Sequence, residues 1–375
     1  YYDENAVSGG NQYYRGDGTP ATWNKQSAAT LYARWTANTY SVEISPNGGS
    51  GGAAPNYTVS STDQTVTLTS LPTKNGCSIS GWTVTGAQGG TPTVSGSTLT
   101  IPAKTYGNLT LTPTWSGNTY KVTVDANGGS GGGSLTYTFS EMRQQKTFTL
   151  PTKTGYSISK WTVTGAKDGN PTVNGNTLTL VPGVYGDIKL TPTWTANTYA
   201  VTFNANGGGT PSTASKNVTY DSTYGTLATC TRTGYTFAGW YTAASGGTKI
   251  DTTTKVAITS AQTLYAHWTA NTYTVKFNGN GNSGGSTANE TMTYGTAKAL
   301  TANGFTRTGY AFAGWAKSAT GTKAYSDKQV VSNLTSTANG TFDLYALWTA
   351  KTYTVTFDAN GGGTPSTASK NVTYD

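Results

Sequence analysis

Few side chains in this 375-residue chain could do chemistry. The sequence has one histidine, His267, so Ser-His-Asp or Cys-His catalysis would depend on it. Related segments of the chain carry different residues at the same position: Arg34, Thr114, Thr193 and Leu347. A position that accepts all of these side chains is typical of an exposed strand rather than of a catalytic centre.

The acidic and sulfur-containing residues do not form a recognisable site either. The 16 carboxylates are scattered, with no calcium-binding loop and no pair at repeated positions for glycoside hydrolysis. The Asn-Gly-Gly-Gly turns lack the lysine and the following helix of a phosphate loop. The two cysteines, Cys77 and Cys230, fall in different segments and are expected to be isolated thiols. We expect no enzyme activity, no cofactor and no metal site.

Arg15-Gly16-Asp17 is the strongest sequence lead to a binding function. In an exposed loop this tripeptide can be recognised by integrins, with Arg and Asp reaching an acidic pocket and a metal-bearing pocket. The alternative is a chance tripeptide in a glycine-rich loop. The sequence leaves both interpretations open.

The overall charge favours only weak, non-specific attraction. Lys and Arg number 24, which gives a net charge of +8, but they are spread along the chain. Without a basic stripe, nucleic-acid binding is not expected. Attraction to an anionic polymer, such as teichoic acid or a host glycosaminoglycan, stays open. No apolar stretch reaches the ~18 residues of a membrane span, so we expect none in this segment.

The elements that would carry any site are revealed by an internal repeat. A Trp followed five residues later by Tyr recurs at intervals of 80, 79, 74 and 80 residues. A second Trp in each interval ends a block of the form basic-x-Gly-aromatic-x-x-x-x-Trp. The sequence therefore predicts four repeats, at 36–115, 116–194, 195–268 and 269–348. Residues 1–35 match the back half of a repeat and 349–375 the front part of another.

The last segment of the chain nearly duplicates an earlier one. Residues 352–375 match residues 198–221 at 22 of 24 positions. Such near-identity indicates recent duplication, and we interpret the chain as part of a longer array.

Within each repeat the local signals are those of strands and turns. The opening segment, such as Tyr199–Phe203, alternates apolar and polar residues and runs into an Asn-Gly turn. The closing segment contains Pro113 or Pro192 in two repeats, which predicts an edge or bulged position. No segment favours a helix of three turns, so we expect low helix content.

The aromatic residues are expected to form the core of each repeat. One buried aromatic side chain removes about 150–250 Å² from water. Cys77 takes the place of a tyrosine in its block and is interpreted as a substituted core residue. The competing hypothesis is a stacking platform for sugars, which alternation along strands disfavours. The predicted core tryptophans are Trp35, Trp82, Trp115, Trp161, Trp194, Trp240, Trp268, Trp315 and Trp348.

Three motifs carry a resemblance to a known family. They are Tyr-x-Val-x-Phe-x-Ala-Asn-Gly-Gly, Thr-Arg-Thr-Gly-Tyr-x-Phe-x-Gly-Trp and Leu-Tyr-Ala-x-Trp. The pattern resembles the Listeria–Bacteroides repeat, or internalin B-repeat, closely at 199–268 and 273–348 and more loosely at 40–115 and 120–194. The resemblance implies a β-dominated α+β fold: small β-grasp, ubiquitin-like units in tandem, as found in bacterial surface proteins.

The short linkers predict how the units connect. Only four residues, such as Thr195–Thr198, separate a closing Trp from the next opening Tyr, which should restrict bending. In a β-grasp unit the first and last strands are parallel, so the chain enters and leaves at opposite ends. We therefore expect an elongated rod, on the order of 150 Å for the whole array.

These observations favour a structural function. We interpret the chain as a non-catalytic stalk, spacer or extracellular fibre region of a bacterial cell-surface, adhesin-like protein, with other copies of itself as a candidate partner in a fibre or filament. The alternative is a ligand-binding adhesion module that recognises a host receptor or an anionic glycan.

Overall fold

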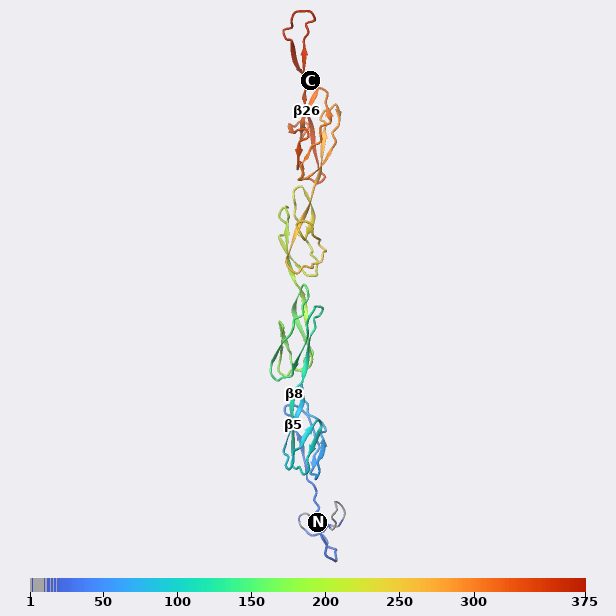
Figure 1. Cartoon of the computed structure of the whole chain (residues 1–375), viewed down its shortest axis with the longest axis vertical. Helices are drawn as coiled ribbons and strands as arrows, with labels where there is room; N and C mark the ends of the chain where they lie inside the picture. The colour runs from blue at the N-terminus through green and yellow to red at the C-terminus, as the bar shows by residue number, and fades with distance from the viewer. Residues whose placement is uncertain (1, 3–9, 11, 14, 16, 18) are drawn as a thin grey trace. The chain divides into compact units, whose positions relative to one another are not determined.

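A computed structural model describes every residue except 1, 3–9, 11, 14, 16 and 18 (Figure 1). Every regular element in the described residues is a β-strand, and none is a helix. The fold is therefore all-β, and the α+β class implied by the resemblance is wrong. The longest connection in the third repeat, residues 220–234 between β17 (Ser215–Thr219) and β18 (Tyr235–Tyr241), is rich in Thr and Gly. Both residue types have low helix propensity.

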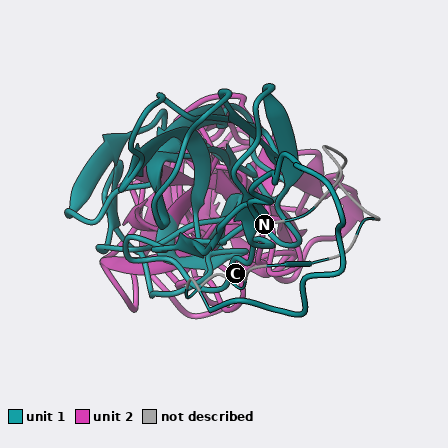
Figure 2. Cartoon of the chain, turned by 90° about the horizontal axis from the view of Figure 1, so that it is seen from below, with its two compact units in different colours: residues 1–153, 158–193 teal, residues 154–157, 194–375 magenta. Residues whose placement is uncertain are grey.

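The chain divides into two compact units (Figure 2). The first contains residues 1–153 and 158–193, and the second contains 154–157 and 194–375. Each is described by itself.

The strands of the first two repeats form small sheets. In the first repeat they are β1 (Thr39–Tyr40), β2 (Val42–Ile44), β3 (Tyr57–Thr58), β4 (Gln64–Thr67), β5 (Cys77–Thr85), β6 (Thr93–Ser95), β7 (Thr98–Ile101) and β8 (Leu109–Gly117). In the second they are β9 (Thr119–Val124), β10 (Gly133–Thr138), β11 (Gln144–Thr147), β12 (Tyr156–Thr164), β13 (Thr172–Asn174), β14 (Thr177–Leu180) and β15 (Ile188–Ala196).

The third and fourth repeats each contain a five-stranded sheet. The strands of the third are β16 (Thr198–Asn204), β17 (Ser215–Thr219), β18 (Tyr235–Tyr241), β19 (Lys249–Ile250) and β20 (Gln262–Ala270). Those of the fourth are β21 (Thr272–Asn278), β22 (Gly284–Gly285), β23 (Glu290–Thr293), β24 (Lys298–Ala299), β25 (Phe305–Thr306), β26 (Tyr310–Ala316), β27 (Lys323–Tyr325), β28 (Val330–Val331) and β29 (Thr341–Ala350). A final hairpin consists of β30 (Thr352–Thr356) and β31 (Ser369–Thr373).

An opening strand and the closing strand of each repeat lie side by side and parallel, as expected. In the third repeat β16 pairs with β20 from Val201↔Gln262 to Asn204↔Tyr265. The strand that carries the second Trp, β18, pairs antiparallel with the other side of β20, with a bulge between Phe237 and Gly239. The closing strand is thus central in its sheet.

Pro113 and Pro192 therefore lie in central strands, where the sequence predicted an edge or a bulge. The parallel ladder between β2 and β8 ends at Leu111, two residues before Pro113. Likewise, the ladder between β9 and β15 ends at Leu190. Each proline lies beyond the end of the parallel ladder between the opening and closing strands. Its missing N–H therefore costs no hydrogen bond to the opening strand.

Each repeat has its own apolar core. Trp240 and Trp315 are fully buried, at 2% and 0% exposed. Trp82, Trp161, Trp268 and Trp348 are half-buried and pack against the cores of their repeats. Trp115 and Trp194 are also half-buried. The prediction for Trp35 is wrong, because its side chain is 91% exposed and belongs to none of the four core clusters of the described residues.

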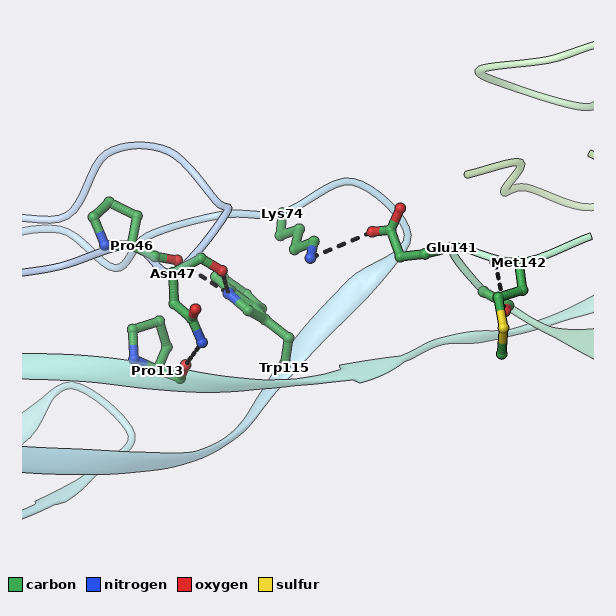
Figure 3. Close-up of polar contacts among 8 residues, drawn as sticks. Pro46, Asn47, Lys74, Pro113, Trp115, Glu141 and Met142 are labelled. Atoms are coloured by element: carbon green, nitrogen blue, oxygen red, sulfur yellow. Dashed lines mark hydrogen bonds and ion pairs between the residues drawn. The ribbon is translucent and has the colours of Figure 1, made fainter. Parts of the chain in front are cut away.

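The closing Trp fixes the Asn-Gly turn, as the first repeat shows (Figure 3). The Trp115 indole donates to the carbonyls of Pro46 and Asn47, at 3.0 and 3.1 Å. The Asn47 side-chain amide donates to the Pro113 carbonyl at 3.1 Å. Asn47 has φ 51° and the following Gly48 φ 78°, the left-handed conformation that Asn and Gly tolerate. The spacing of Asn-Gly and Trp thus joins the two ends of the repeat.

Candidate functional site: the joints between repeats

The structurally most regular site is the joint between consecutive repeats. We define a joint as three residues: the Gly of the basic-x-Gly block, the single residue between the strands of two repeats, and the aromatic residue that follows the strand paired antiparallel with the next opening strand. The four joints are Gly76/Asn118/Phe139, Gly155/Asn197/Tyr220, Gly234/Asn271/Tyr294 and Gly309/Lys351/Tyr374.

The linker is almost entirely strand. β15 ends at Ala196 and β16 begins at Thr198, so only Asn197 lies outside a strand. The other three joints likewise have one residue between strands. The sequence defines each linker as the four residues between Trp and Tyr. In the structure, three of these four residues belong to the flanking strands, so the linker is nearly continuous extended chain.

Backbone hydrogen bonds tie the linker residue to both sides of the joint. The Asn197 N–H donates to the Gly155 carbonyl at 2.9 Å, and the Asn197 carbonyl accepts from the Tyr220 N–H at 2.9 Å. The Asn197 side chain accepts a hydrogen bond from the Ser157 hydroxyl at 2.7 Å. The same two backbone bonds occur at all four joints, at 2.8–2.9 Å. The linker residue therefore has little backbone freedom.

An aromatic ring covers the glycine of each joint. A Cβ atom at Gly155 would collide with the Tyr220 ring, and Gly155 also has φ +75°. Only glycine meets both conditions without strain. The Tyr220 ring also packs edge-on against Tyr156, with ring centroids 5.6 Å apart. Such aromatic pairs contribute about 0.5–1.5 kcal/mol beyond their buried area.

The Gly-aromatic tyrosines thus serve a different role from the predicted one. Tyr156, Tyr235 and Tyr310 are half-buried and lie at joints, where each packs on an aromatic residue of the following repeat or hairpin. Arg232 and Arg307 lie over the rings of Tyr235 and Tyr310, at 3.9 and 4.1 Å from the centroids. The basic-x-Gly-aromatic block is therefore a joint motif, stabilised in two repeats by cation–π contact.

The first joint compensates for the absence of a tyrosine. Cys77 stands in the tyrosine position and is half-buried at the joint rather than in the core. Burial, together with nearby Glu141, raises its pKa, against the effect of Lys74. Lys74 forms an ion pair with Glu141 at 3.4 Å (Figure 3), and Asn75 donates to Asp168 at 2.9 Å. Polar contacts thus replace the aromatic pair.

His267 is tied into the fold rather than arranged for catalysis. Its ring stacks on Tyr241, with centroids 3.9 Å apart, and Nε2 lies 2.9 Å from the Ala243 carbonyl. The side chain is half-buried, so the prediction of an exposed position is wrong. In the part of the chain that the structure describes, no three His, Cys, Asp or Glu residues group to hold a metal ion.

The Arg-Gly-Asp segment is only partly described, because Gly16 lies outside the described residues. Arg15 and Asp17 are exposed. The Asp17 carboxylate accepts hydrogen bonds from Thr19, at 2.9 Å from N–H and 2.6 Å from the hydroxyl. The hydroxyl bond and then the backbone bond hold the pKa of Asp17 below its usual value. A receptor metal ion would compete with Thr19 for this carboxylate.

The joint aromatic was not identified from the sequence, although a signal is present. Phe139, Tyr220, Tyr294 and Tyr374 each follow a threonine that ends a strand, in segments reading apolar-Thr-aromatic. Such a short motif is indistinguishable from an ordinary strand pattern until the glycine it covers is known.

Comparison with known proteins agrees with this architecture. The profile of the Listeria-Bacteroides repeat domain matches residues 40–112, 120–181, 199–267 and 273–346. The chain is 28% identical over 340 residues to a "Putative Gly-rich membrane protein" of Evansella cellulosilytica, covering 89% of this chain and 36% of that protein. It is also 28% identical over 293 residues to a "Putative membrane protein" of the same organism, covering 76% of this chain and 40% of that protein.

The chain thus spans well under half the length of these relatives. A membrane-crossing helix, long and apolar enough for the purpose, is not found among the described residues. The four matched segments account for most of the chain, and each contains the Asn-Gly turn that follows the opening strand of its repeat. The chain belongs to the Listeria-Bacteroides repeat domain family.

Proposed function

We propose that this chain is a non-catalytic spacer region of a bacterial cell-envelope protein, whose tandem repeats hold other parts of that protein away from the surface. The β-grasp-like units would follow one another as a semi-rigid rod, with the chain entering and leaving each unit at opposite ends. The names of the relatives support an envelope location. A role as an adhesin stalk or extracellular filament fits the same geometry.

The repeated joint is the observation that carries this proposal. Four joints share the same backbone hydrogen bonds and the same ring over a glycine. A flexible tether would need none of these contacts, because Gly- and Ser-rich linkers already supply flexibility. Repeated joint contacts instead favour a fixed angle between neighbours.

Small-angle X-ray scattering of the whole chain tests the shape. A compact globule of this length has a radius of gyration of about 21 Å. A rod of about 150 Å has one of about 43 Å, from the uniform-rod relation applied to the unit size above. A value near the compact figure contradicts the spacer proposal.

Spin-label distance measurements test the joint itself. Labels at the exposed positions Asn170 and Ser245, in a chain carrying Cys77→Ser and Cys230→Ala, report the distance across the second joint. Tyr220→Ala should broaden the distance distribution, because the ring over Gly155 is removed. Tyr106→Ala, an exposed tyrosine outside the joints, is the matched control and should leave it unchanged. Equal distributions in both variants would show that the ring does not restrict the joint.

A further inference from the structure

The repeats differ at one sheet edge. In the third and fourth repeats, the strand with the second Trp is covered on its outer side by a short strand: β19 beside β18, and β27 beside β26. In the first and second repeats, the equivalent strands β5 and β12 are the last in their sheets. Both are nine residues long, so each presents unpaired backbone groups along an open edge.

The short strands show what this edge accepts. Ile250 of β19 pairs with Trp240 and is buried against it, and Lys249 pairs with Tyr241. The Lys249 side chain covers Gly239, where an added Cβ would lie 2.6 Å from Lys249 Cε. In the fourth repeat Tyr325 pairs with Trp315, and Lys323 covers Gly314 in the same way. The edge thus takes an antiparallel segment with one apolar residue and one long side chain.

The first two repeats direct the equivalent segment elsewhere. β6 and β13 follow β5 and β12 in the chain, as β19 follows β18, but they pair with β7 and β14. An Asn-Gly or Ser-Gly turn, such as Asn174-Gly175, folds this segment into a hairpin of its own. The outer edge of the Trp strand therefore stays open.

A groove lies along each open edge. In the second repeat it has a volume of about 660 Å³ and lies between Ile158–Trp161 of β12 and Pro171–Gly175. In the first repeat it has about 350 Å³ and is lined by the equivalent residues, including Trp82 and Leu71. Trp82 and Trp161 are only half-buried, unlike Trp240 and Trp315. The same groove thus occurs twice, each time beside a tryptophan that the chain covers only in part.

We propose that the open edges of β5 and β12 bind an extended peptide strand of another protein. The peptide pairs antiparallel with the edge, and an aliphatic or aromatic residue covers Trp82 or Trp161, as Ile250 covers Trp240. Strand addition of this kind gains affinity from backbone hydrogen bonds and specificity from alternate side chains. β19 and β27 of a second copy do not supply the peptide, because each is already paired within its own repeat.

The two edges prefer different peptides. The space over Gly81 in β5 is open: a Cβ atom added at Gly81 would have Thr114 Cβ as its nearest neighbour, at 4.0 Å. Gly81 can therefore accept the aliphatic part of a lysine side chain, as Gly239 does. In β12 the equivalent residue is Lys160, which is exposed and occupies that space. The space over Gly81 therefore favours a long side chain such as lysine in the peptide bound to β5. Charge complementarity with Lys160 favours glutamate at the same peptide position on β12.

Hydrogen exchange of the full chain with two synthetic peptides tests the proposal. The peptide acetyl-Gly-Thr-Lys-Ile-Asp-Thr-amide copies residues 247–252, and its partner carries Glu in place of Lys. The Lys peptide should slow exchange mainly at 81–85, and the Glu peptide mainly at 160–164. Lys160→Gly should weaken binding of the Glu peptide to β12 by up to about fivefold, the strength of an exposed ion pair.

Two controls keep the result interpretable. Gly81→Leu should abolish protection at β5 because it fills the space for the lysine stem, whereas Thr100→Leu, on an exposed position of β7, should not. Methylation of the peptide isoleucine nitrogen should remove protection at both edges.

Three outcomes would overturn the proposal. The first is no protection at millimolar peptide, and the second is equal protection by the methylated peptide. The third is protection that depends on protein concentration without peptide, which would indicate pairing with a second copy.

Discussion

Trp240 and Trp315 occupy equivalent positions in two repeats and differ in one hydrogen bond. The Trp240 indole donates to the Ala228 carbonyl at 2.7 Å. The equivalent indole nitrogen of Trp315 is buried and has no hydrogen-bond partner among the described residues. An unsatisfied buried donor costs about 1–3 kcal/mol, so the two side chains stabilise their repeats unequally.

This difference predicts unequal effects of the same substitution. Phenylalanine leaves a similar cavity at both sites, but Trp240→Phe also loses a hydrogen bond, whereas Trp315→Phe removes an unsatisfied donor. Trp240→Phe should therefore destabilise its repeat by about 1–3 kcal/mol more than Trp315→Phe destabilises the other. Hydrogen exchange of amides in β18 and β26 gives the local unfolding free energy of each repeat, and thus the loss of stability caused by each substitution. Equal losses would contradict this account.

Tyr137 predicts a pH dependence of the second repeat. Burial, with smaller effects from Tyr120 and Asp187, raises the pKa of Tyr137 to about 12 from its ordinary value near 10. The folded state therefore favours the neutral phenol, which adds stability below pH 10. That contribution is lost as the pH rises from 10 to 12.

Replacement of Tyr137 tests whether this residue causes the predicted loss of stability at high pH. Tyr137→Phe should cost about 1 kcal/mol at neutral pH, since the hydroxyl donates to the Gly186 carbonyl at 2.7 Å. It should also flatten the loss of stability between pH 10 and 12, measured by urea unfolding at each pH. Tyr106→Phe, on an exposed side chain, should leave the pH profile as it is.

At the scale of elements, the joint predicts a penalty from one added methyl group. Gly155→Ala places a Cβ against the Tyr220 ring, whereas Gly175→Ala meets nothing within 4 Å. Both glycines have positive φ, 75° and 56°, so the backbone strain of about 1–2 kcal/mol is common to both variants.

Only Gly155→Ala should therefore open the joint. Faster amide exchange at Asn197 and Tyr220 in that variant, with no change at these amides in Gly175→Ala, is the expected result. If both variants behave alike, backbone strain rather than ring contact determines the joint.

At the scale of the whole molecule, the parallel pairing of opening and closing strands predicts the response to force. Tension on the two ends of a repeat loads these strands in shear, so several ladder hydrogen bonds must break together. Repeats with separate cores should unfold one at a time. Pulling the chain by its termini should therefore give four similar force peaks, each lengthening the chain by on the order of 250 Å. A single unfolding event would contradict independent repeats.

Much of this architecture could be predicted from the sequence because it depends on local patterns. The four tandem repeats and the Asn-Gly turns follow from spacing and turn chemistry, and the Asn47 and Gly48 dihedrals agree with the predicted turn. The parallel end strands are expected from the family resemblance. The joint glycines and the open edges of β5 and β12 could not be predicted. They depend on which distant segment covers a given residue, and no local pattern specifies that.

The duplicated segment separates the contribution of local sequence from that of contacts with distant segments. Residues 198–221 and 352–375 are nearly identical, and both form the same hairpin, with Thr198↔Thr219 matched by Thr352↔Thr373. Yet Phe203 is 5% exposed, and its equivalent Phe357 is 47% exposed. The sequence alone determines the hairpin, its register and its turn. Only the strands packed against it, β20 and β18 in the third repeat, decide whether its apolar face becomes a core, because burial requires contacts that the segment cannot supply itself.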